Sequence, residues 1–167
     1  MSKNERKTEN IVRDTLRKMG YFDDGNSVVI EEQKSNIECV RKLLKSASKS
    51  GQGGIGAPEF IISSAANPDF LVIIECKAST KDHISEACKQ FFQDVCITET
   101  SEEYSKRTQR YAVDGALHYA LRLAKEYNVI AVAVSGETKS GAEITNYLVP
   151  KGGIKAKPLC TKEGKNI

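Results

Sequence analysis

The chain has 167 residues, 40% hydrophobic and 28% charged, which is the size and composition of one globular domain rather than of a disordered segment. Its 25 basic and 22 acidic residues give a net charge of only +3, which neither requires nor excludes a polyanionic partner. No apolar run approaches the roughly 20 residues that cross a membrane, and the polar N-terminus is unlike a signal peptide. We therefore expect a cytoplasmic protein with no membrane partner.

The cysteines give no sign of a metal or disulfide framework. Their number is odd, and no two of them have the Cys-x-x-Cys spacing of many zinc sites. Small buried thiols in a reducing compartment are the simplest interpretation. The residues concerned are Cys39, Cys76, Cys88, Cys96 and Cys160.

The first third of the chain predicts a helix, a strand and a second helix. Apolar residues recur at helical spacing over residues 4–19, between the capping-box pair Ser2 and Glu5 and the stop signal Gly20. The β-branched run in 27–31 predicts a short strand. A second amphipathic helix, an insertion at about 34–49, precedes a glycine-rich loop at 51–56.

Two strands with a turn between them follow. The apolar runs at 58–63 and 70–78 are separated by residues 64–69, which include the turn dipeptide Asn67-Pro68, so they predict a hairpin. The second run is apolar at each of positions 70–74, which is typical of a central strand covered on both faces.

The C-terminal half predicts a helix around 84–92, one long helix over 103–127, and strands at 129–134 and 144–149. A strand, a helix and another apolar strand in succession indicate a parallel, right-handed crossover. The expected fold class is therefore α/β, a mixed β-sheet flanked by helices. We expect one domain over 1–150 and a basic linker or tail over 151–167.

Two charged residues occur at the end of the predicted buried strand, where apolar residues are expected. Glu75 and Lys77 follow five apolar residues and, being two apart on a strand, face the same side of the sheet. Burying such groups costs free energy unless they are paired, hydrogen-bonded or bound to a metal. The end of this strand is therefore the candidate site.

Two acidic residues that follow prolines, Glu59 and Asp69, are candidates for a third charge. Asp69 precedes Glu75 by roughly 20 Å of extended strand, at about 3.3 Å per residue, so the two cannot share a cation. If the hairpin turns near Asn67, residues whose numbers sum to 134 face each other, which pairs position 59 with position 75. Facing side chains have Cβ atoms about 4.5–5.5 Å apart. This geometry favours Glu59 and leaves Asp69 as the runner-up.

Pro58-Glu59, followed by Glu75-Cys76-Lys77 after an apolar strand, resembles the motif of the PD-(D/E)XK nuclease superfamily, with glutamate in place of the first aspartate. The segment RYAVDGALHYALRLAKEYNVIAVAVSGE, residues 110–137, is similar to the nuclease domains of bacterial restriction-modification enzymes. In those enzymes the domain is joined to methyltransferase or translocase modules. The resemblance covers roughly residues 5–149 and implies a restriction-endonuclease-like αβββαβ core.

The resemblance implies hydrolysis of phosphodiester bonds in double-stranded DNA, with Glu59, Glu75 and Lys77 as catalytic residues. Oxygen ligands from Glu59, Glu75 and the Cys76 backbone carbonyl suit Mg²⁺ or Mn²⁺, one ion or two. Glu9, on the apolar face of the first helix, is a further candidate ligand, since similar nucleases use an acid there. Lys77 would stabilise the charge that develops on the phosphate.

The resemblance also implies partners and leaves alternatives open. Methyltransferase, translocase or specificity domains or subunits would supply sequence recognition. The alternatives are a nuclease-fold DNA-binding module without catalysis, suggested by the first glutamate, and a repair or junction-resolving nuclease. Basic side chains that would contact the DNA backbone are Lys42, Lys45, Lys49, Lys106, Arg107 and Arg110.

Overall fold

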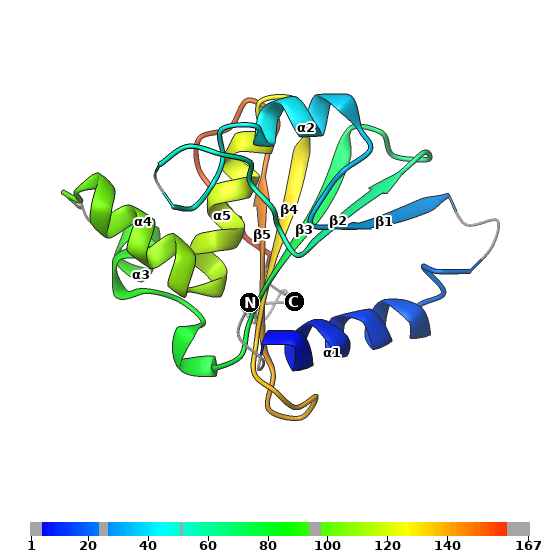
Figure 1. Ribbon diagram of the computed structural model, residues 1–167, viewed down its shortest axis with the longest axis horizontal. Helices are drawn as coiled ribbons and strands as arrows, with labels where there is room; N and C mark the ends of the chain where they lie inside the picture. Colours follow the sequence, from blue (N-terminus) through cyan, green and yellow to red (C-terminus); the bar gives the residue numbers. More distant parts are fainter. Residues whose placement is uncertain (1–4, 24–26, 51, 94–97, 160–167) are drawn as a thin grey trace.

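A six-stranded mixed sheet, with strands in the order β1-β2-β3-β4-β5-β6, forms the middle of the part of the chain that the structure describes. The structure is a computed structural model, and it describes residues 5–23, 27–50, 52–93 and 98–159 (Figure 1). The strands are β1 (Val28–Glu32), β2 (Phe60–Ser64), β3 (Phe70–Lys77), β4 (Asn128–Ser135), β5 (Glu143–Val149) and β6 (Lys157–Pro158).

The pairing of the strands agrees with the predicted hairpin and crossover. β2 and β3 are antiparallel, and Phe60 faces Ile74, so residues whose numbers sum to 134 are opposed, as expected. β3 and β4 are parallel, which confirms a crossover connection between them. β1 pairs with β2 and β5 pairs with β4, both in antiparallel orientation. The α/β class and the mixed sheet flanked by helices are thereby confirmed.

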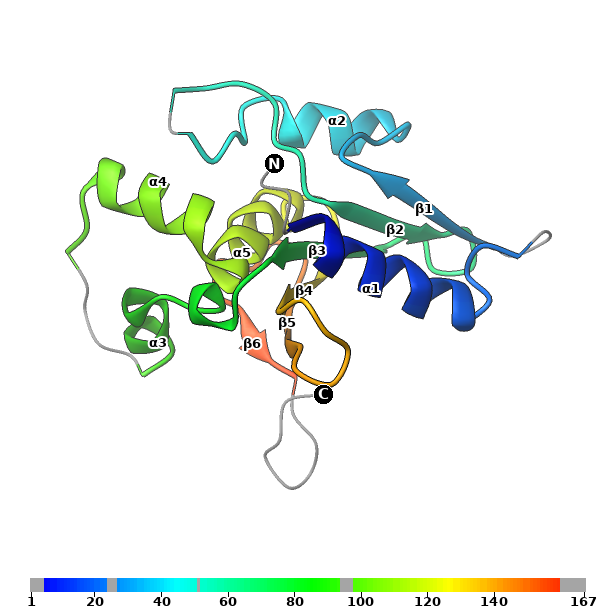
Figure 2. The ribbon, with the colours of Figure 1, turned by 60° about the horizontal axis from the view of Figure 1, so that its bottom comes forward.

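Helices cover both faces of the sheet and bury two separate apolar cores (Figure 2). On one face, α5 (Ala112–Leu123) and α2 (Glu38–Leu44) pack against alternate residues of β3 and β4. On the other face, α1 (Glu5–Lys18) packs against the residues in between. The crossover also contains a short 3-10 turn η1 (Thr80–Asp82), α3 (Glu86–Phe92) and α4 (Ser101–Arg110).

The alternation along β3 decides which core each side chain joins. Ile73 lies in the α5 core, whereas Ile74 and Cys76 lie in the α1 core. Glu75 is therefore directed to the α5 face, because successive side chains of a strand point to opposite sides. By the same alternation, Glu59 lies on this face, next to Phe60 of the α1 core.

The prediction of one long helix over 103–127 is wrong, because the helix breaks at Tyr111. Tyr111 is extended, with φ −101° and ψ 137°, and it ends α4 and starts α5. A capping box formed by Thr100 and Glu103 starts α4. The two helices have different environments, since α5 is buried on nearly all sides and α4 buries only Ser105 and Thr108. A single straight helix could not place one half in the core and the other half at the surface.

The expected cap at Ser2 lies outside the described residues, and α1 is described from Glu5. Two smaller differences concern element ends. The second helix ends at Leu44, so residues 45–50 form a loop instead of continuing its surface. Residues 157–158, within the segment expected to be a linker, pair with β5 as β6. No helix in the described ranges has the length and apolarity to span a membrane.

Candidate active centre

Two carboxyl groups meet at the end of the β2–β3 hairpin. Glu75 is 0% exposed near the end of β3, and Glu59 is partly buried just before β2. The hairpin register, continued by one residue from Phe60 and Ile74, opposes these positions. The two carboxyl groups lie close enough for each to shift the pKa of the other. We call Glu59 and Glu75 the acid pair.

The surroundings of the acid pair shift the pKa values of its two members in opposite directions. Burial and the neighbouring carboxylate of Glu75 raise the pKa of Glu59 well above its usual range. Burial also acts to raise the pKa of Glu75, but the ammonium of Lys49, the hydrogen bond from Glu59 and the ammonium of Lys77 outweigh it, and the net shift is downward. Of the two carboxyl groups, Glu75 therefore loses its proton more readily than Glu59.

Lys77 lies beside the acid pair, as its spacing from Glu75 predicts. Its Nζ atom is 3.6 Å from Glu75 Oε1 and 3.3 Å from Glu5 Oε1, and its side chain is 10% exposed. The hydroxyl of Thr8 donates to the carbonyl of Lys77 and of Gly136, which fixes α1 to the ends of β3 and β4. Glu5, in the first turn of α1, is therefore the helix acid that contacts the centre.

A second lysine reaches the acid pair from the loop after α2. Lys49 Nζ contacts Glu75 Oε1 directly, and its side chain is 15% exposed. It also lies 5.3 Å from the ring centroid of Tyr119. Burial acts to lower the pKa of Lys49, but the carboxylates of Glu75 and Glu59 outweigh it and raise the value. Lys49 is part of this centre, although its neighbours in sequence lie on the surface.

The helix α5 provides the wall behind the acid pair. A Cβ atom at Gly115 would lie 3.1 Å from Cδ and Oε1 of Glu75, so this position has no room for a side chain. One turn later, the Tyr119 hydroxyl accepts a hydrogen bond of 3.2 Å from the Ala57 backbone N–H. That bond holds the segment leading into Glu59 against α5. The acid pair is therefore fixed from both sides.

The remaining expected ligands lie elsewhere. Asp69 is exposed in the turn at the opposite end of β3 from Glu75. Glu9 is buried on α1, where its Oε2 accepts from Arg13 and its Oε1 has no hydrogen-bond partner in the described chain. The Cys76 side chain packs in the α1 core, so this residue could offer the centre only its backbone.

The donor set of the acid pair fits a hard divalent cation. Oε2 of Glu59 and of Glu75 are buried without a hydrogen-bond partner among the described residues. Mg²⁺ binds through one or two carboxylates and keeps several water molecules. In the described ranges no group of three or more His, Cys, Asp or Glu side chains is placed to hold a metal, so the acid pair would offer two side-chain ligands.

The basic residues proposed as DNA contacts fall into different environments. Three of them form exposed ion pairs, which bridge Lys42 with Glu38, Lys106 with Glu102, and Arg110 with Asp82. Arg107 is partly buried instead, and it donates to Glu99 and to the buried Asp114. Lys45 is exposed and has no ion-pair partner within the described residues.

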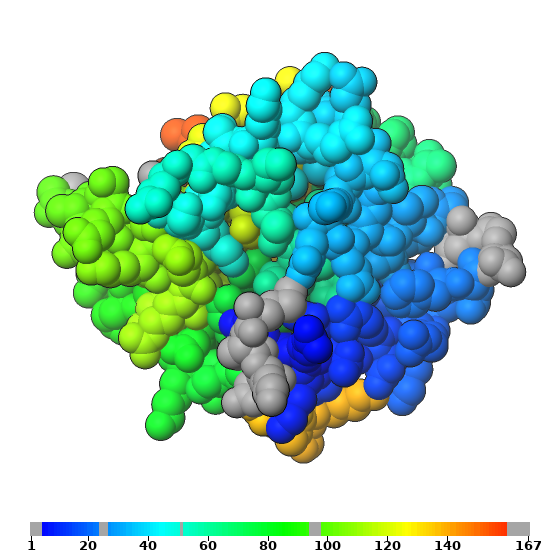
Figure 3. Space-filling model, viewed as in Figure 1, coloured from blue at the N-terminus to red at the C-terminus, as the bar shows by residue number. Residues whose placement is uncertain are grey.

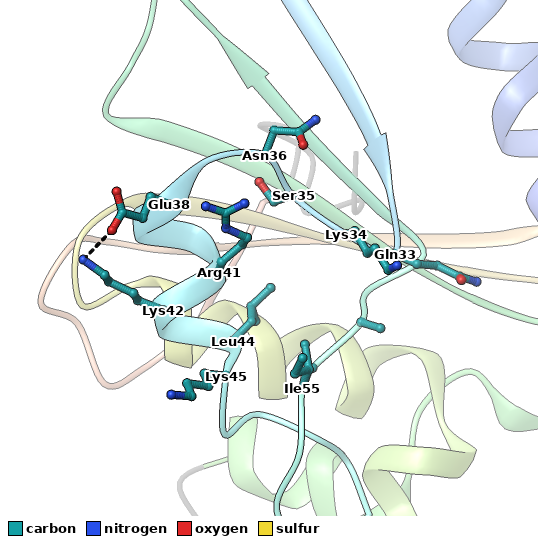
Figure 4. A pocket seen from close by; sticks show the side chains of 12 residues that line it. Gln33, Lys34, Ser35, Asn36, Glu38, Arg41, Lys42, Leu44, Lys45 and Ile55 are labelled. Atoms are coloured by element: carbon teal, nitrogen blue, oxygen red, sulfur yellow. Dashed lines mark ion pairs between the residues drawn. The ribbon is translucent and has the colours of Figure 1, made fainter.

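A basic pocket of about 650 Å³ lies between α2, the residues after β1 and the segment before β2 (Figure 4). The backbone N–H of Gln33, one of its lining residues, donates to the carbonyl of Glu59 over 3.2 Å, which links the pocket wall to the backbone of the acid pair, although neither acid lines the pocket. Arg41 and Lys45 project from α2 and the residue after it, and neither has an ion-pair partner in the described chain. In the space-filling view, α2 and the following loop cover the upper part of the molecule, with α1 below them (Figure 3).

The sequence analysis missed Glu5 and Gly115 as parts of the centre, and it assigned Lys49 to the surface. Glu5 was noted only as a capping residue, and its position one turn before Glu9 was the available signal. A glycine on the apolar stripe of a predicted helix was the signal for Gly115, because glycine there often marks a close approach. No local pattern distinguishes Lys49 from Lys42 or Lys45, since its direction depends on where α2 ends.

One curated relative is similar to this chain: the type II restriction enzyme and methyltransferase RM.BcgI of Heyndrickxia coagulans, 30% identical over 156 residues. The alignment covers 90% of this chain and 21% of that protein, so the chain spans about a fifth of the relative's length. No protein-family model and no solved structure matches the chain. The chain is therefore related in sequence to a protein of restriction and modification, in line with the resemblance found in its motifs.

Proposed function

We propose that this chain is a metal-dependent DNA endonuclease domain of the PD-(D/E)XK type and the cleavage module of a restriction-modification enzyme. The observation that carries the proposal is the acid pair, a buried and a partly buried carboxyl group opposed across the β2–β3 hairpin with two lysines beside them. The core of α1, the antiparallel strands β1 to β3, α5 and the parallel strand β4, with α2 inserted after β1 and shorter helices before α5, supports it, as does the relative.

Glu59 and Glu75 would hold Mg²⁺ or Mn²⁺ through their unpartnered oxygens, with the Cys76 carbonyl as a further candidate ligand. When bound, the cation would supply a water nucleophile of lowered pKa and neutralise charge on the phosphate. As a ligand Glu59 would be ionised, and any proton on it would pass to solvent. The close approach of Gly115 to Glu75 and the hydrogen bond of Tyr119 to Ala57 hold the surroundings of the two carboxylates in place.

Lys77 would act by charge rather than as a base. Its ammonium lies between Glu75 and Glu5, at the end of β3 where the acid pair lies. A fixed cation there stabilises the extra negative charge of a pentavalent phosphate, and preorganised charges of this kind contribute strongly to catalysis. The Glu5 contact holds the ammonium in position before substrate arrives.

The basic pocket would receive the DNA backbone next to the scissile phosphate. Arg41 and Lys45 are available for phosphate contacts, which fix register without reading sequence. Sequence recognition would come from methyltransferase, translocase or specificity partners. The relative, whose name includes a methyltransferase, supports this arrangement.

A second candidate is a nuclease-fold binding module without catalysis. The contact of Lys49 with Glu75 favours it, because that ammonium already neutralises the acid pair. A module of this kind would bind DNA and no divalent ion.

Cleavage of plain and branched duplex DNA with Mg²⁺, Mn²⁺ or EDTA tests the proposal. We expect metal-dependent cutting, which Glu59→Gln and Glu75→Gln abolish and the matched control Asp69→Asn retains, since Asp69 lies at the far end of β3. Loss of cutting in Asp69→Asn with retention in Glu59→Gln would instead identify Asp69 as the first acid. Preference for branched DNA would indicate a junction-resolving enzyme, and absence of both cutting and Mn²⁺ binding would reject the nuclease.

A further inference from the structure

We propose that Lys49 is a built-in counter-cation of the acid pair, which occupies the position of a divalent metal ion and must move out before that ion binds. This inference rests on the proposed function, since it names the step by which the nuclease centre becomes loaded. It assigns Lys49 a role distinct from both catalysis by Lys77 and surface contact with DNA.

The position of the ammonium is the first argument. Lys49 Nζ contacts Glu75 Oε1, and the carboxylates of both Glu75 and Glu59 act on it. A cation that binds both carboxylates has to share this space. The ring of Tyr119, 5.3 Å from Nζ, gives the ammonium a second favourable contact while it is inside.

The balance of charge is the second argument. Glu59, Glu75 and Glu5 surround the two ammonium groups of Lys49 and Lys77. With all three carboxylates ionised, the centre carries one net negative charge. If a divalent ion bound while Lys49 stayed in place, the net charge of the centre would become +1. If Lys49 left as the ion bound, the net charge would be zero. Since uncompensated buried charge is costly, metal entry and Lys49 departure should be linked.

The loop that carries Lys49 allows such an exchange. Its backbone carbonyl accepts a 2.7 Å hydrogen bond from Ser105 of α4, so the main chain is tethered while the side chain can rotate. Lys49 lies outside α2, and the glycines at 53 and 54 that follow have positive φ, with open space around the position of a Cβ atom at Gly53. The side chain therefore can leave the acid pair without unfolding of a helix or strand.

The first experiment measures the accessibility of the Lys49 amine in the full wild-type chain. Amine acylation followed by mass spectrometry should show low reactivity of Lys49 in EDTA and a several-fold increase at saturating Mn²⁺. Lys45, which is exposed, serves as the matched control and should react equally in both conditions. Unchanged protection of Lys49 in a chain that has bound Mn²⁺ would overturn the inference.

The second experiment measures Mn²⁺ affinity by calorimetry for the wild type, Lys49→Met and Lys49→Arg. Without the competing ammonium, Lys49→Met should bind Mn²⁺ about tenfold more tightly, equivalent to ~1.4 kcal/mol. Lys49→Arg keeps the charge and should stay close to the wild type. Equal or weaker binding by Lys49→Met contradicts competition, whereas absence of binding by all three proteins rejects the metal site itself. If Lys49→Met does not fold in EDTA but folds when Mn²⁺ is added, the result supports the exchange. If this variant folds in neither condition, the acylation experiment on the wild type decides.

Discussion

Gly115 of α5 lies directly against the carboxylate of Glu75: a Cβ atom at this position would be 3.1 Å from Cδ and Oε1 of that side chain. The same Cβ would be 2.9 Å from the carbonyl oxygen of Thr108. A glycine in a helix interior costs about 0.5–1 kcal/mol relative to alanine, so its presence here indicates a steric requirement. The requirement is a buried carboxylate directly beneath the helix.

Gly115→Ala should therefore displace Glu75 and damage the centre more than the fold. We expect a loss of stability of about 1–3 kcal/mol from overpacking, together with loss of Mn²⁺ binding. Val113→Ala, also buried on α5, should lower stability by a comparable amount and retain Mn²⁺ binding. Urea unfolding and calorimetry measure the two effects. Normal Mn²⁺ binding by Gly115→Ala would show that Glu75 tolerates the extra methyl group.

The two members of the acid pair should change stability with pH in opposite directions in EDTA. The pKa of Glu59 is raised in the folded state, so its stabilising contribution is present at low pH and disappears as the pH rises above the ordinary glutamate value of 4.5. Glu59→Gln should thus gain stability relative to the wild type as pH increases toward neutral. At neutral pH the gain should exceed the ~0.5 kcal/mol typical of surface substitutions.

Glu75→Gln should show the reverse. The pKa of Glu75 is lowered, so its contribution is present above the ordinary value and disappears as the pH falls through the folded-state value. The variant should be less stable than the wild type at neutral pH, and the difference should shrink toward acid. Urea titrations across this range measure both variants. Parallel curves for the two substitutions would refute the division of charge between them.

Lys77→Ala should abolish cleavage while the fold survives. Loss of one preorganised cation near a developing negative charge typically lowers kcat by about 10²–10³. Mn²⁺ binding should persist, because both carboxylates remain. Single-turnover cleavage, with circular dichroism to monitor the fold, provides the measurement. A variant that cut DNA at the parent rate would remove Lys77 from the mechanism.

Arg107→Ala should affect stability rather than DNA contact. Arg107 donates to Glu99 and to the buried Asp114, and Asp114 also accepts from Ser85, so the substitution leaves a carboxylate without its cation. Breaking a buried ion pair in this way costs about 3–5 kcal/mol. Chemical unfolding should show this loss directly.

Lys45→Ala is the comparison for that result. The residue is exposed, so stability should change little, while DNA binding at low salt should weaken and depend less steeply on salt. Binding by fluorescence anisotropy at several salt concentrations tests this. The assignment of Arg107 would be wrong if Arg107→Ala kept the stability of the wild type and lost DNA affinity. The assignment of Lys45 would be wrong if Lys45→Ala kept its DNA affinity.

The sheet and its hairpin were predictable because their signals are local. An unbroken apolar run defines β3, and the turn at Asn67 sets the register that opposes positions 59 and 75. The break at Tyr111 was not predictable, since residues on both sides of it have good helical patterns. It follows from the need to bury α5 nearly completely while α4 stays at the surface.

The contact of Lys49 with the acid pair was also not predictable from the sequence. Its spacing continues the charged face that includes Lys42 and Lys45, and only the end of α2 at Leu44 turns the chain toward the acid pair. The contact depends on Tyr119 and Glu75, which lie far away along the chain. Sequence patterns report on residues that are close along the chain, whereas this centre is built mostly from residues that are far apart along it.

The tether between Thr8 and the last residues of β3 and β4 has a consequence for when the centre can exist. Glu5 reaches Lys77 only after the N-terminal helix has docked on strands made from later parts of the chain. A partly synthesised or nicked polypeptide could therefore oppose Glu59 and Glu75 in the hairpin but would lack the contact that positions the Lys77 ammonium. The two ends of the described chain thus have to come together before the centre is complete.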